Sequence, residues 1–403
     1  MATGATHAKL YDLWLATMRT LLSKVDQIRE RFLTRSYGWT GVEIGCHCLN
    51  MAQVRKVEDR WQLAAVWTVD HPIPYALKAD SDTSTVDETF GWLSSDDILE
   101  CGLSSTISLL DKLDSLFYGK NCAATLNDGL IAYRELEIPT SDESDSHSMV
   151  RSEVATETEC ELEEILTDCW ALPQNRPRAT TTSFGVVSLK RSTAMMLASD
   201  LLQAGFECQV LDAMPCAMAR ATSMALENSS TNAQVPTLAI DLGYQHATIT
   251  LVDDGTPILT RTLRNSGLVQ LLEQIASTFE VSLSDAQTLL FQSPSSRSVS
   301  PDKTDDFTNP LQQKRNAYLM SLASEIEKTI LYANRTYRTV APTQILLMGG
   351  GVRIPNVQQS IEDRVDLPTH FWSIDTSKNL FGMKHPGIYA VASGLSALAW
   401  EGM

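Results

Sequence analysis

The sequence lacks long hydrophobic runs and has few basic residues for its size. No apolar stretch approaches the roughly 18 residues that a membrane-spanning helix needs. Lysine and arginine total 32 against 49 acidic residues in the 403-residue chain, for a net charge of −17. A broad nucleic-acid surface needs clustered cations, so this balance argues against nucleic acid as a partner. The remaining composition, 43% hydrophobic and 20% charged, is that of a globular protein long enough for two domains.

The eight cysteines form no framework for disulfides, redox chemistry or zinc. None lies in a Cys-x-x-Cys motif. The stretch "VEIGCHCLNM" (42–51) holds the closest pair, Cys46 and Cys48, but no second Cys/His pair has the spacing of a structural zinc site. We therefore interpret both thiols as small side chains in a tight turn, in a protein of the reducing cytoplasm.

A pattern of three alternating strands, with a carboxylate at the end of the first, occurs twice. Glu43 precedes Gly45 in the first half, and Asp241 precedes Gly243 in the second. The expected strands cover residues 42–44, 49–57 and 61–69, and then 240–242, 247–252 and 257–263. Gly255, after two aspartates, predicts a hairpin turn between the last two.

Each triplet is followed, after an insertion, by a strand, a helix, a strand and a helix. The expected elements are a buried strand at 184–189, a helix at 194–202, a strand at 208–211 and a helix from 215, and then a strand at 344–348, a helix from 355, a strand near 371 and a helix at 387–399. Two such series indicate an internal duplication of an α/β fold.

The repeated carboxylate and glycine suggest a phosphate-binding turn in each half. Glycine has no Cβ and tolerates positive φ, so each turn can present backbone N–H groups to phosphate oxygens. If the halves face each other, Glu43 and Asp241 would hold Mg²⁺ through water against a polyphosphate. Gly349, Gly350 and Gly351 would let another part of the ligand lie against bare backbone. The alternative is that these glycines only make tight turns.

These stretches resemble the actin-like ATPase superfamily of actin, the 70-kDa heat-shock proteins, sugar kinases and FtsA. "VEIGCHC" (42–48) is similar to its first phosphate loop, "IDLGYQH" (240–246) to its second, and "LMGGGVRIPN" (347–356) to its adenosine motif. Residues 211–221 and 387–399 are similar to its two connecting helices. The resemblance implies a duplicated, ribonuclease H-like fold of two lobes that binds ATP or ADP with Mg²⁺.

The resemblance also implies the nucleotide-binding residues, which are Glu43, Gly45, Cys46, His47, Cys48, Asn50, Asp241, Gly243, Tyr244, Gln245, Gly267, Gly349, Gly350 and Gly351. Several depart from the superfamily pattern. Glu43 replaces an aspartate, thiols and an imidazole replace hydroxyl donors, Asn50 replaces a frequent lysine, and Gly267 is one of two usual glycines. These departures affect hydrolysis more than binding, because the backbone N–H groups remain. We expect at most a slow ATPase and assign no catalytic residue.

Within the superfamily, residues 40–54, 118–140 and 258–290 resemble the PilM family of cytoplasmic type IV pilus assembly proteins. This implies an adaptor, peripheral to the inner membrane, at a pilus or type II secretion-like platform. It also implies that an inserted subdomain captures the cytoplasmic peptide of a PilN-like membrane protein, which an exposed strand edge would suit. The alternatives are an active ATPase or small-molecule kinase, and a scaffold that has lost nucleotide.

The expected domains are an N-terminal amphipathic helix (1–35), a first actin-like lobe (36–75 and 171–226), an inserted partner-binding subdomain (76–170), a second lobe (235–265 and 343–403) and its inserted subdomain (266–342). The subdomain at 76–170 would hold a helix at 95–117, a strand pair at 118–140 and an acidic, solvated helix within 140–168. Segments 227–237 and 293–310 are expected to be a linker and a loop.

The N-terminal segment has an apolar stripe at steps of three and four, made of Tyr11, Trp14, Met18, Leu21, Val25, Ile28 and Phe32. Residues 9–35 are also basic, unlike the rest of the chain. Two interpretations stay open. The helix packs on its own domain or on a second copy, forming a homo-oligomer, or it lies on the anionic membrane surface.

Overall fold

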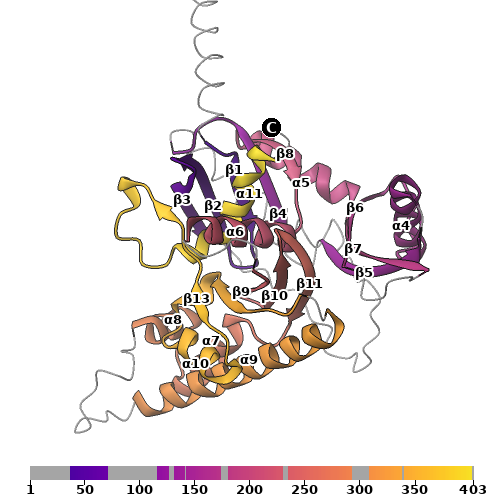
Figure 1. Ribbon diagram of the computed structural model, residues 1–403. Coiled ribbons are helices and arrows are strands. Elements are labelled where there is room, and N and C mark those ends of the chain that lie inside the picture. The colour runs from indigo at the N-terminus through magenta and orange to yellow at the C-terminus, as the bar shows by residue number, and fades with distance from the viewer. Residues whose placement is uncertain are drawn as a thin grey trace, which may run out of the picture.

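The computed structural model describes residues 37–70, 116–126, 131–140, 142–173, 180–229, 235–292, 308–337 and 340–401. Two mixed sheets form the body, and a three-stranded sheet stands at its side (Figure 1). Within the described ranges, no helix combines the length and the apolar character needed to cross a membrane. The predictions for residues 1–35, 95–115, 230–234 and 293–307 lie outside the described residues.

The first sheet has the strand order β14-β3-β2-β1-β4-β8. Its strands are β1 (Thr40–Ile44), β2 (Cys48–Val57), β3 (Arg60–Asp70), β4 (Asn121–Leu126), β8 (Glu207–Leu211) and β14 (Asp375–Thr376). The antiparallel meander β1-β2-β3 is confirmed. The strand parallel to β1 is β4, however, so the prediction that residues 184–189 belong to this lobe is wrong.

The second sheet has the order β11-β10-β9-β12-β13, which matches β3-β2-β1-β4-β8 strand for strand. Its strands are β9 (Thr237–Leu242), β10 (Ala247–Asp253), β11 (Thr256–Leu263), β12 (Gln344–Met348) and β13 (Thr369–Phe371). The β10–β11 turn has Asp254 at φ 47° and Gly255 at φ 74°, as a tight hairpin requires. The matching orders confirm the predicted duplication.

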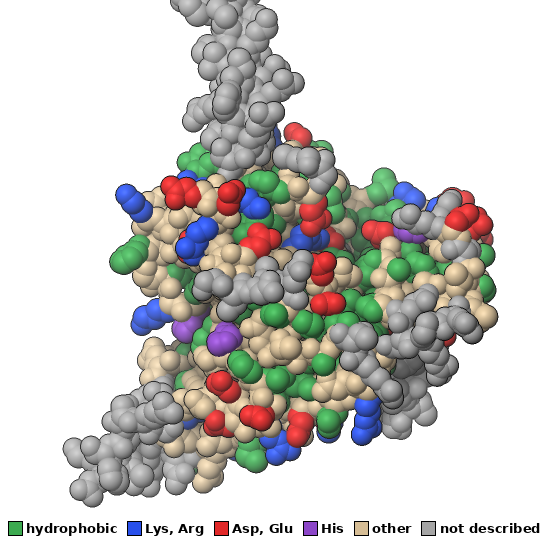
Figure 2. Space-filling view, viewed as in Figure 1, with side chains coloured by type: hydrophobic (Ala, Val, Ile, Leu, Met, Phe, Trp, Pro, Cys, Tyr) green, Lys and Arg blue, Asp and Glu red, His purple; other side chains and the backbone are tan. Residues whose placement is uncertain are grey.

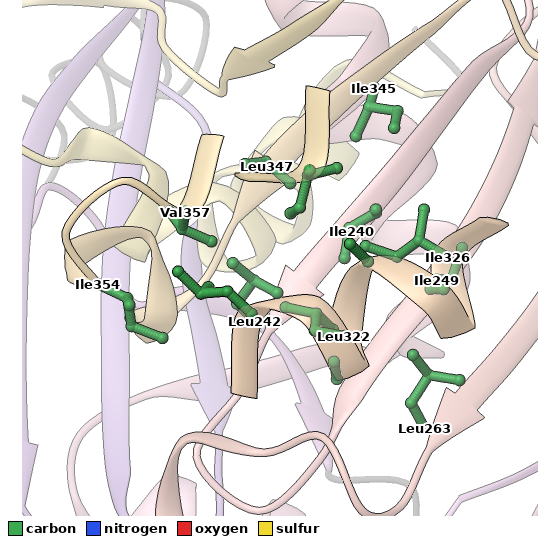
Figure 3. Packing of buried hydrophobic residues seen from close by; sticks show 14 of the residues in the cluster. Ile240, Leu242, Ile249, Leu263, Leu322, Ile326, Ile345, Leu347, Ile354 and Val357 are labelled. Carbon is green, nitrogen blue, oxygen red and sulfur yellow. The ribbon is translucent and has the colours of Figure 1, made fainter. Parts of the chain in front are cut away.

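The core of the second lobe lies between this sheet and its helices, which are α7 (Leu268–Phe279), α8 (Leu283–Gln292), α9 (Thr308–Thr336) and α10 (Val357–Val365). Figure 3 shows Ile240 and Ile249 of the sheet packed near Leu322 and Ile326 of α9. Each such buried side chain contributes about 1.5–3 kcal/mol, which fixes the sheet as a rigid base. Residues 308–310, predicted as loop, begin α9.

Two helices join the lobes. Helix α6 (Met214–Asn228) contacts strands of both sheets, and α11 (Ala390–Ser396), between the short helices η4 (Pro386–Tyr389) and η5 (Ala397–Trp400), packs on α6, β1 and β2. A Cβ on Gly394 would lie 2.0 Å from the carbonyl oxygen of Ala217, so only glycine allows this crossing. The prediction that all of residues 343–403 belong to the second lobe is therefore wrong, because α11 and β14 pack on the first sheet.

The third sheet has the order β5-β7-β6 and is covered by α4 (Glu143–Glu157). Its strands are β5 (Ala132–Pro139), β6 (Ile165–Ala171) and β7 (Thr181–Lys190), and α5 (Arg191–Gln203) returns the chain to the first lobe. The predicted strand pair at 118–140 is wrong, because β4 and β5 join different sheets. Local alternation cannot reveal which sheet a strand joins, since that depends on distant partners.

Candidate functional site

The turns that follow β1 and β9 meet between the two lobes. We name residues 45–47 loop 1 and residues 243–246 loop 2. The ring of His47 in loop 1 stacks on that of Tyr244 in loop 2, with centroids 4.2 Å apart and planes at 12°. The structure therefore brings the two duplicated turns into direct contact.

The carboxyl groups of Glu43 and Asp241 lie close enough to interact. Glu43 is half-buried on β1, and Asp241 on β9 is 4% exposed. Burial, and then the negative charge of Asp241, raise the pKa of Glu43 to about 8, while a hydrogen bond from Asn50 lowers it. Burial first, and then the neighbouring negative charge, favour the protonated form of Glu43, and a divalent cation would relieve the repulsion between the two carboxylates.

A row of polar side chains holds Glu43 in place. Sheet register puts Glu43, Asn50 and Thr68 side by side on β1, β2 and β3. The amide of Asn50 donates to Glu43 Oε2 at 3.4 Å, and the hydroxyl of Thr68 donates to Asn50 Oδ1 at 2.9 Å. The hydroxyl of Tyr389, from η4, lies 3.1 Å from that of Thr68. Asn50 thus orients the carboxyl group, where a lysine would neutralise it.

The glycines of the two loops are required for steric reasons. Neither Gly45 nor Gly243 has a positive φ, so the expectation that they use left-handed conformations is wrong. A Cβ on Gly243 would lie 2.6 Å from the carbonyl oxygen of His246, and one on Gly45 would lie 3.0 Å from that of Cys48. Each loop is a turn folded tightly on itself, which leaves no room for a side chain at that residue.

The three glycines after β12 differ from one another. Gly349 has φ +83°, and its Cβ would lie 2.3 Å from Asp241 Oδ1, while a Cβ on Gly351 would lie 2.6 Å from that of Leu242. Gly350 alone of the three has open space there. Gly349 therefore packs against the carboxylate, and Gly350 offers the bare backbone that the sequence predicted for a ligand.

The start of α7 is bonded to loop 2. The N–H groups of Leu268 and Val269 donate to the carbonyl oxygens of Gly243 and Tyr244, at 3.1 and 2.8 Å. A Cβ on Gly267 would lie 2.1 Å from the carbonyl carbon of Gln245. Gly267 thus lets the helix approach loop 2 closely, and these first helical N–H groups stabilise the loop itself.

The thiols of Cys46 in loop 1 and of Cys48 at the start of β2 are unsuited to redox or metal chemistry. Cys46 is 6% exposed and packs in the first-lobe core. Burial, followed by the charges of Glu43 and Asp70, raises the pKa of Cys48 to about 12, so its thiol keeps its proton at neutral pH. Across the described parts of the chain, no group of three or more His, Cys, Asp or Glu side chains could hold a metal ion.

Sequence reasoning missed Arg353, the last residue of η2 (Gly350–Arg353). Its Nε donates to the carbonyl oxygen of Gly350 at 3.3 Å, and its guanidinium lies 4.3 Å from the ring centre of Phe291. Burial lowers the pKa of Arg353, and Cys48 and Asp70 of the first lobe oppose that shift. It is a cation at the junction of the lobes. The sequence signal that could have identified Arg353 as a site residue is its position two residues after the triple glycine.

Comparison with known proteins identifies the fold. The sequence model of the family described as type IV pilus assembly protein PilM matches residues 120–385. The structure is similar to the solved PilM-PilN type IV pilus biogenesis complex, with TM-score 0.63, 17% identity and coverage of 91% of this chain and 98% of that one. Among curated proteins, none matches the sequence significantly.

Weaker likenesses extend to other solved structures. Ethanolamine utilization protein EutJ from Carboxydothermus hydrogenoformans gives TM-score 0.48 and 11% identity, covering 89% of each chain. MreB 5 of Spiroplasma citri bound to AMPPNP gives 0.36 and 15%, covering 52% of this chain and 65% of that one. The predicted fold, a duplicated actin-like α/β fold of two lobes with inserted units, is confirmed.

Proposed function

The chain belongs to the PilM family of type IV pilus assembly proteins, and we propose that it is a nucleotide-binding adaptor of the pilus platform. The observation that carries this proposal is the Glu43–Asp241 pair. Two interacting carboxyl groups, one with its pKa raised to about 8, repel each other, and a bound divalent cation would relieve that repulsion.

The residues present fit Mg²⁺ with a polyphosphate. Two carboxylates would hold the cation through water, and phosphate oxygens would complete its octahedron, so no third protein ligand is needed. Gly350 exposes backbone beside Asp241, and Arg353 supplies positive charge at the same junction. ATP or ADP is the ligand that the superfamily resemblance implies.

Calorimetric titration with Mg-ADP and Mg-ATP tests this proposal. Full-length protein should release heat, and Glu43→Gln and Asp241→Asn should each weaken binding about tenfold or more. Asp254→Asn, in the β10–β11 turn, is a control that removes an acidic charge outside the site. Absence of binding by the full-length protein would reject the nucleotide.

Turnover should be slow, because Cys46, His47 and Cys48 offer thiols and a ring where hydroxyl donors would stabilise a transferring phosphoryl group. Phosphate release faster than several per second would instead indicate an active ATPase or a kinase.

A scaffold without nucleotide is the second candidate, and the stack of His47 on Tyr244 favours it. The rings join the two loops at the place where phosphates would have to enter. In that case calorimetry shows no heat with either nucleotide, and Glu43 remains protonated at pH 7.

The partner site we propose is the groove between α4 and β5. It has a volume of about 460 Å³ and is lined by Glu137, Ile138, Pro139, Ser148, Met149, Ser152 and Glu153. Acidic side chains gather around this unit (Figure 2), and β5 is an edge strand of its sheet. A peptide with alternating apolar and basic side chains could pair with that edge and place its cations near Glu137 and Glu153. The solved relative is a complex with PilN, which supports a PilN-like peptide.

Charge reversal tests the groove. Glu137→Lys and Glu153→Lys should weaken binding of the partner's synthetic cytoplasmic peptide about tenfold, measured by fluorescence anisotropy. Glu280→Lys, an exposed acidic residue on the second lobe, is the matched control. Equal binding by all three variants would exclude this groove.

We place the adaptor at the cytoplasmic face of the inner membrane, with residues 9–35 as the segment in contact with lipid. Deletion of residues 1–34 should abolish co-sedimentation with anionic vesicles. If vesicle binding is unchanged by the deletion, or is absent in the full chain, this segment instead packs on its own domain or on a second copy of the chain. Light scattering detects the second case, because the deletion then lowers the mass of the assembly.

A further inference from the structure

The rings of His47 and Tyr244 connect the two lobes where their loops meet. Their 4.2 Å separation and 12° angle describe a parallel stack, an attractive arrangement for two aromatic rings. Burial lowers the pKa of His47, Asp70 opposes this shift and Arg353 adds to it, so the imidazole is neutral at pH 7. Its Nδ1 is buried and has no hydrogen-bond partner among the described residues, so no hydrogen bond from this nitrogen orients the ring, and the stack on Tyr244 does.

Backbone hydrogen bonds fix the loop that carries each ring. The N–H of Gly45 donates to the carbonyl oxygen of Cys48 at 3.0 Å and closes loop 1. The N–H of Val269 donates to the carbonyl oxygen of Tyr244, and the tyrosine ring packs against the second-lobe core. Because both backbones are held, the stacked rings set how far apart the two loops lie.

We propose that His47 and Tyr244 are positioning residues whose stack holds loop 1 against loop 2 without ligand, so that a polyphosphate must part the rings to reach Glu43 and Asp241. The ligand-dependent part rests on the proposed function. The proposal explains the imidazole between two thiols: Cys46 is buried within its own lobe, whereas the His47 ring contacts the opposite one. The plain alternative is a packing contact with no bearing on ligand access.

The first test asks whether the stack closes the loops in the full-length chain without ligand. The chain has seven histidines, so selective ¹³C-histidine labelling can resolve His47 by NMR. Its ring protons should be shifted upfield by the tyrosine ring, unchanged in Tyr244→Phe and returned to ordinary values in Tyr244→Ala. Amide exchange at the ends of β1 and β9 should become faster in Tyr244→Ala and His47→Ala only.

The second test measures Mg-ADP and Mg-ATP binding to the same proteins by calorimetry. An aromatic pair is worth about twofold to tenfold in an equilibrium constant, so parting the rings lowers apparent affinity by that factor. Tyr244→Ala and His47→Ala should therefore bind the nucleotide twofold to tenfold more tightly than Tyr244→Phe and the natural sequence. Tyr332→Ala, at an exposed ring on α9, should change nothing.

An ordinary His47 shift, or unchanged exchange in the alanine variants, would overturn the proposal. The His47 ring protons could be shifted upfield as expected while both alanine variants bind nucleotide equally well or more weakly than the natural sequence. That result would overturn the ligand-dependent part of the proposal and leave the stack as a packing contact. If no protein binds nucleotide, the proposed function fails, and the exchange rates alone decide whether the rings hold the loops together.

Discussion

The two sheets of the body share one strand order but hold their carboxylates by different means. In the first, Glu43 lies beside Asn50, whose amide donates to it at 3.4 Å. In the second, Thr248 takes the equivalent place on β10, and Gly349 packs against Asp241. One carboxyl group is oriented by a polar side chain on its own sheet, and the other is enclosed by the tight turn that follows β12.

The halves also differ in the units that follow their strands. The second half has α7, α8 and α9 between β11 and β12, and the first has the three-stranded unit after β4, while residues 71–115, between β3 and β4, lie outside the described part of the chain. The start of α7 bonds directly to loop 2, and no described residue of the three-stranded unit donates a backbone hydrogen bond to loop 1. Among the described residues, loop 2 therefore has the firmer backbone support, and we expect loop 1 to be the part that moves when a ligand enters.

Gly349→Ala should have the largest effect, because it breaks the packing of the turn after β12 against Asp241. A Cβ would meet Asp241 Oδ1 at 2.3 Å and the backbone nitrogen of Leu242 at 2.9 Å, at φ +83°. We expect a loss of about 4 kcal/mol in the free energy of unfolding, measured with urea. Gly350→Ala, where a Cβ would enter open space, should change the free energy of unfolding by less than about 0.5 kcal/mol. Equal losses would contradict the packing argument.

Glu43→Gln should change how the free energy of unfolding depends on pH, which tests how the first half holds its carboxyl group. The folded pKa of Glu43, about 8, lies above the ordinary 4.5, so its protonated form stabilises the fold fully below pH 4.5 and this stability is lost as pH rises through 8. Relative to Glu43→Gln, the natural protein should lose roughly 4 kcal/mol of unfolding free energy between pH 5 and 9 without Mg²⁺.

Glu325→Gln is the control for that series. A hydrogen bond from Lys328 lowers the pKa of Glu325, so its contribution is present above the ordinary pKa and disappears only as the solution becomes acidic. Parallel curves for the natural protein and Glu43→Gln from pH 5 to 9 would show that Glu43 is not held protonated.

Trp170→Phe should have the smallest effect. Its Nε1 donates to the carbonyl oxygen of Pro257 at 2.8 Å, which ties the three-stranded unit to β11 of the second lobe. Losing one such bond costs about 1 kcal/mol. Hydrogen exchange should become faster in β7 and β11, while loop 2 keeps its protection. Faster exchange throughout both lobes would mean that the tryptophan supports the core instead of joining two units.

Periodicity and turn chemistry in the sequence were sufficient to locate the strands of both meanders, the hairpin at Gly255 and the helices α5, α6 and α10. They failed for β4 and β7, which each contain a run of buried apolar residues without a local sign of the sheet they join. Either could lie beside β1 on local evidence, and only pairing with residues about 80 positions away decides. The same limit hid Arg353, since nothing local places its charge beside Asp70.

By itself the sequence determined the duplicated strand pattern, the two carboxylates at equivalent places and the glycines that follow them, because these depend on residue type and short spacing. Only the tertiary structure decided that Gly349 encloses Asp241, that Glu43 keeps its proton near neutral pH, and that His47 stacks on Tyr244. Those properties arise from contacts between chain segments roughly 100 to 200 residues apart, and burial and close packing act only once such segments meet.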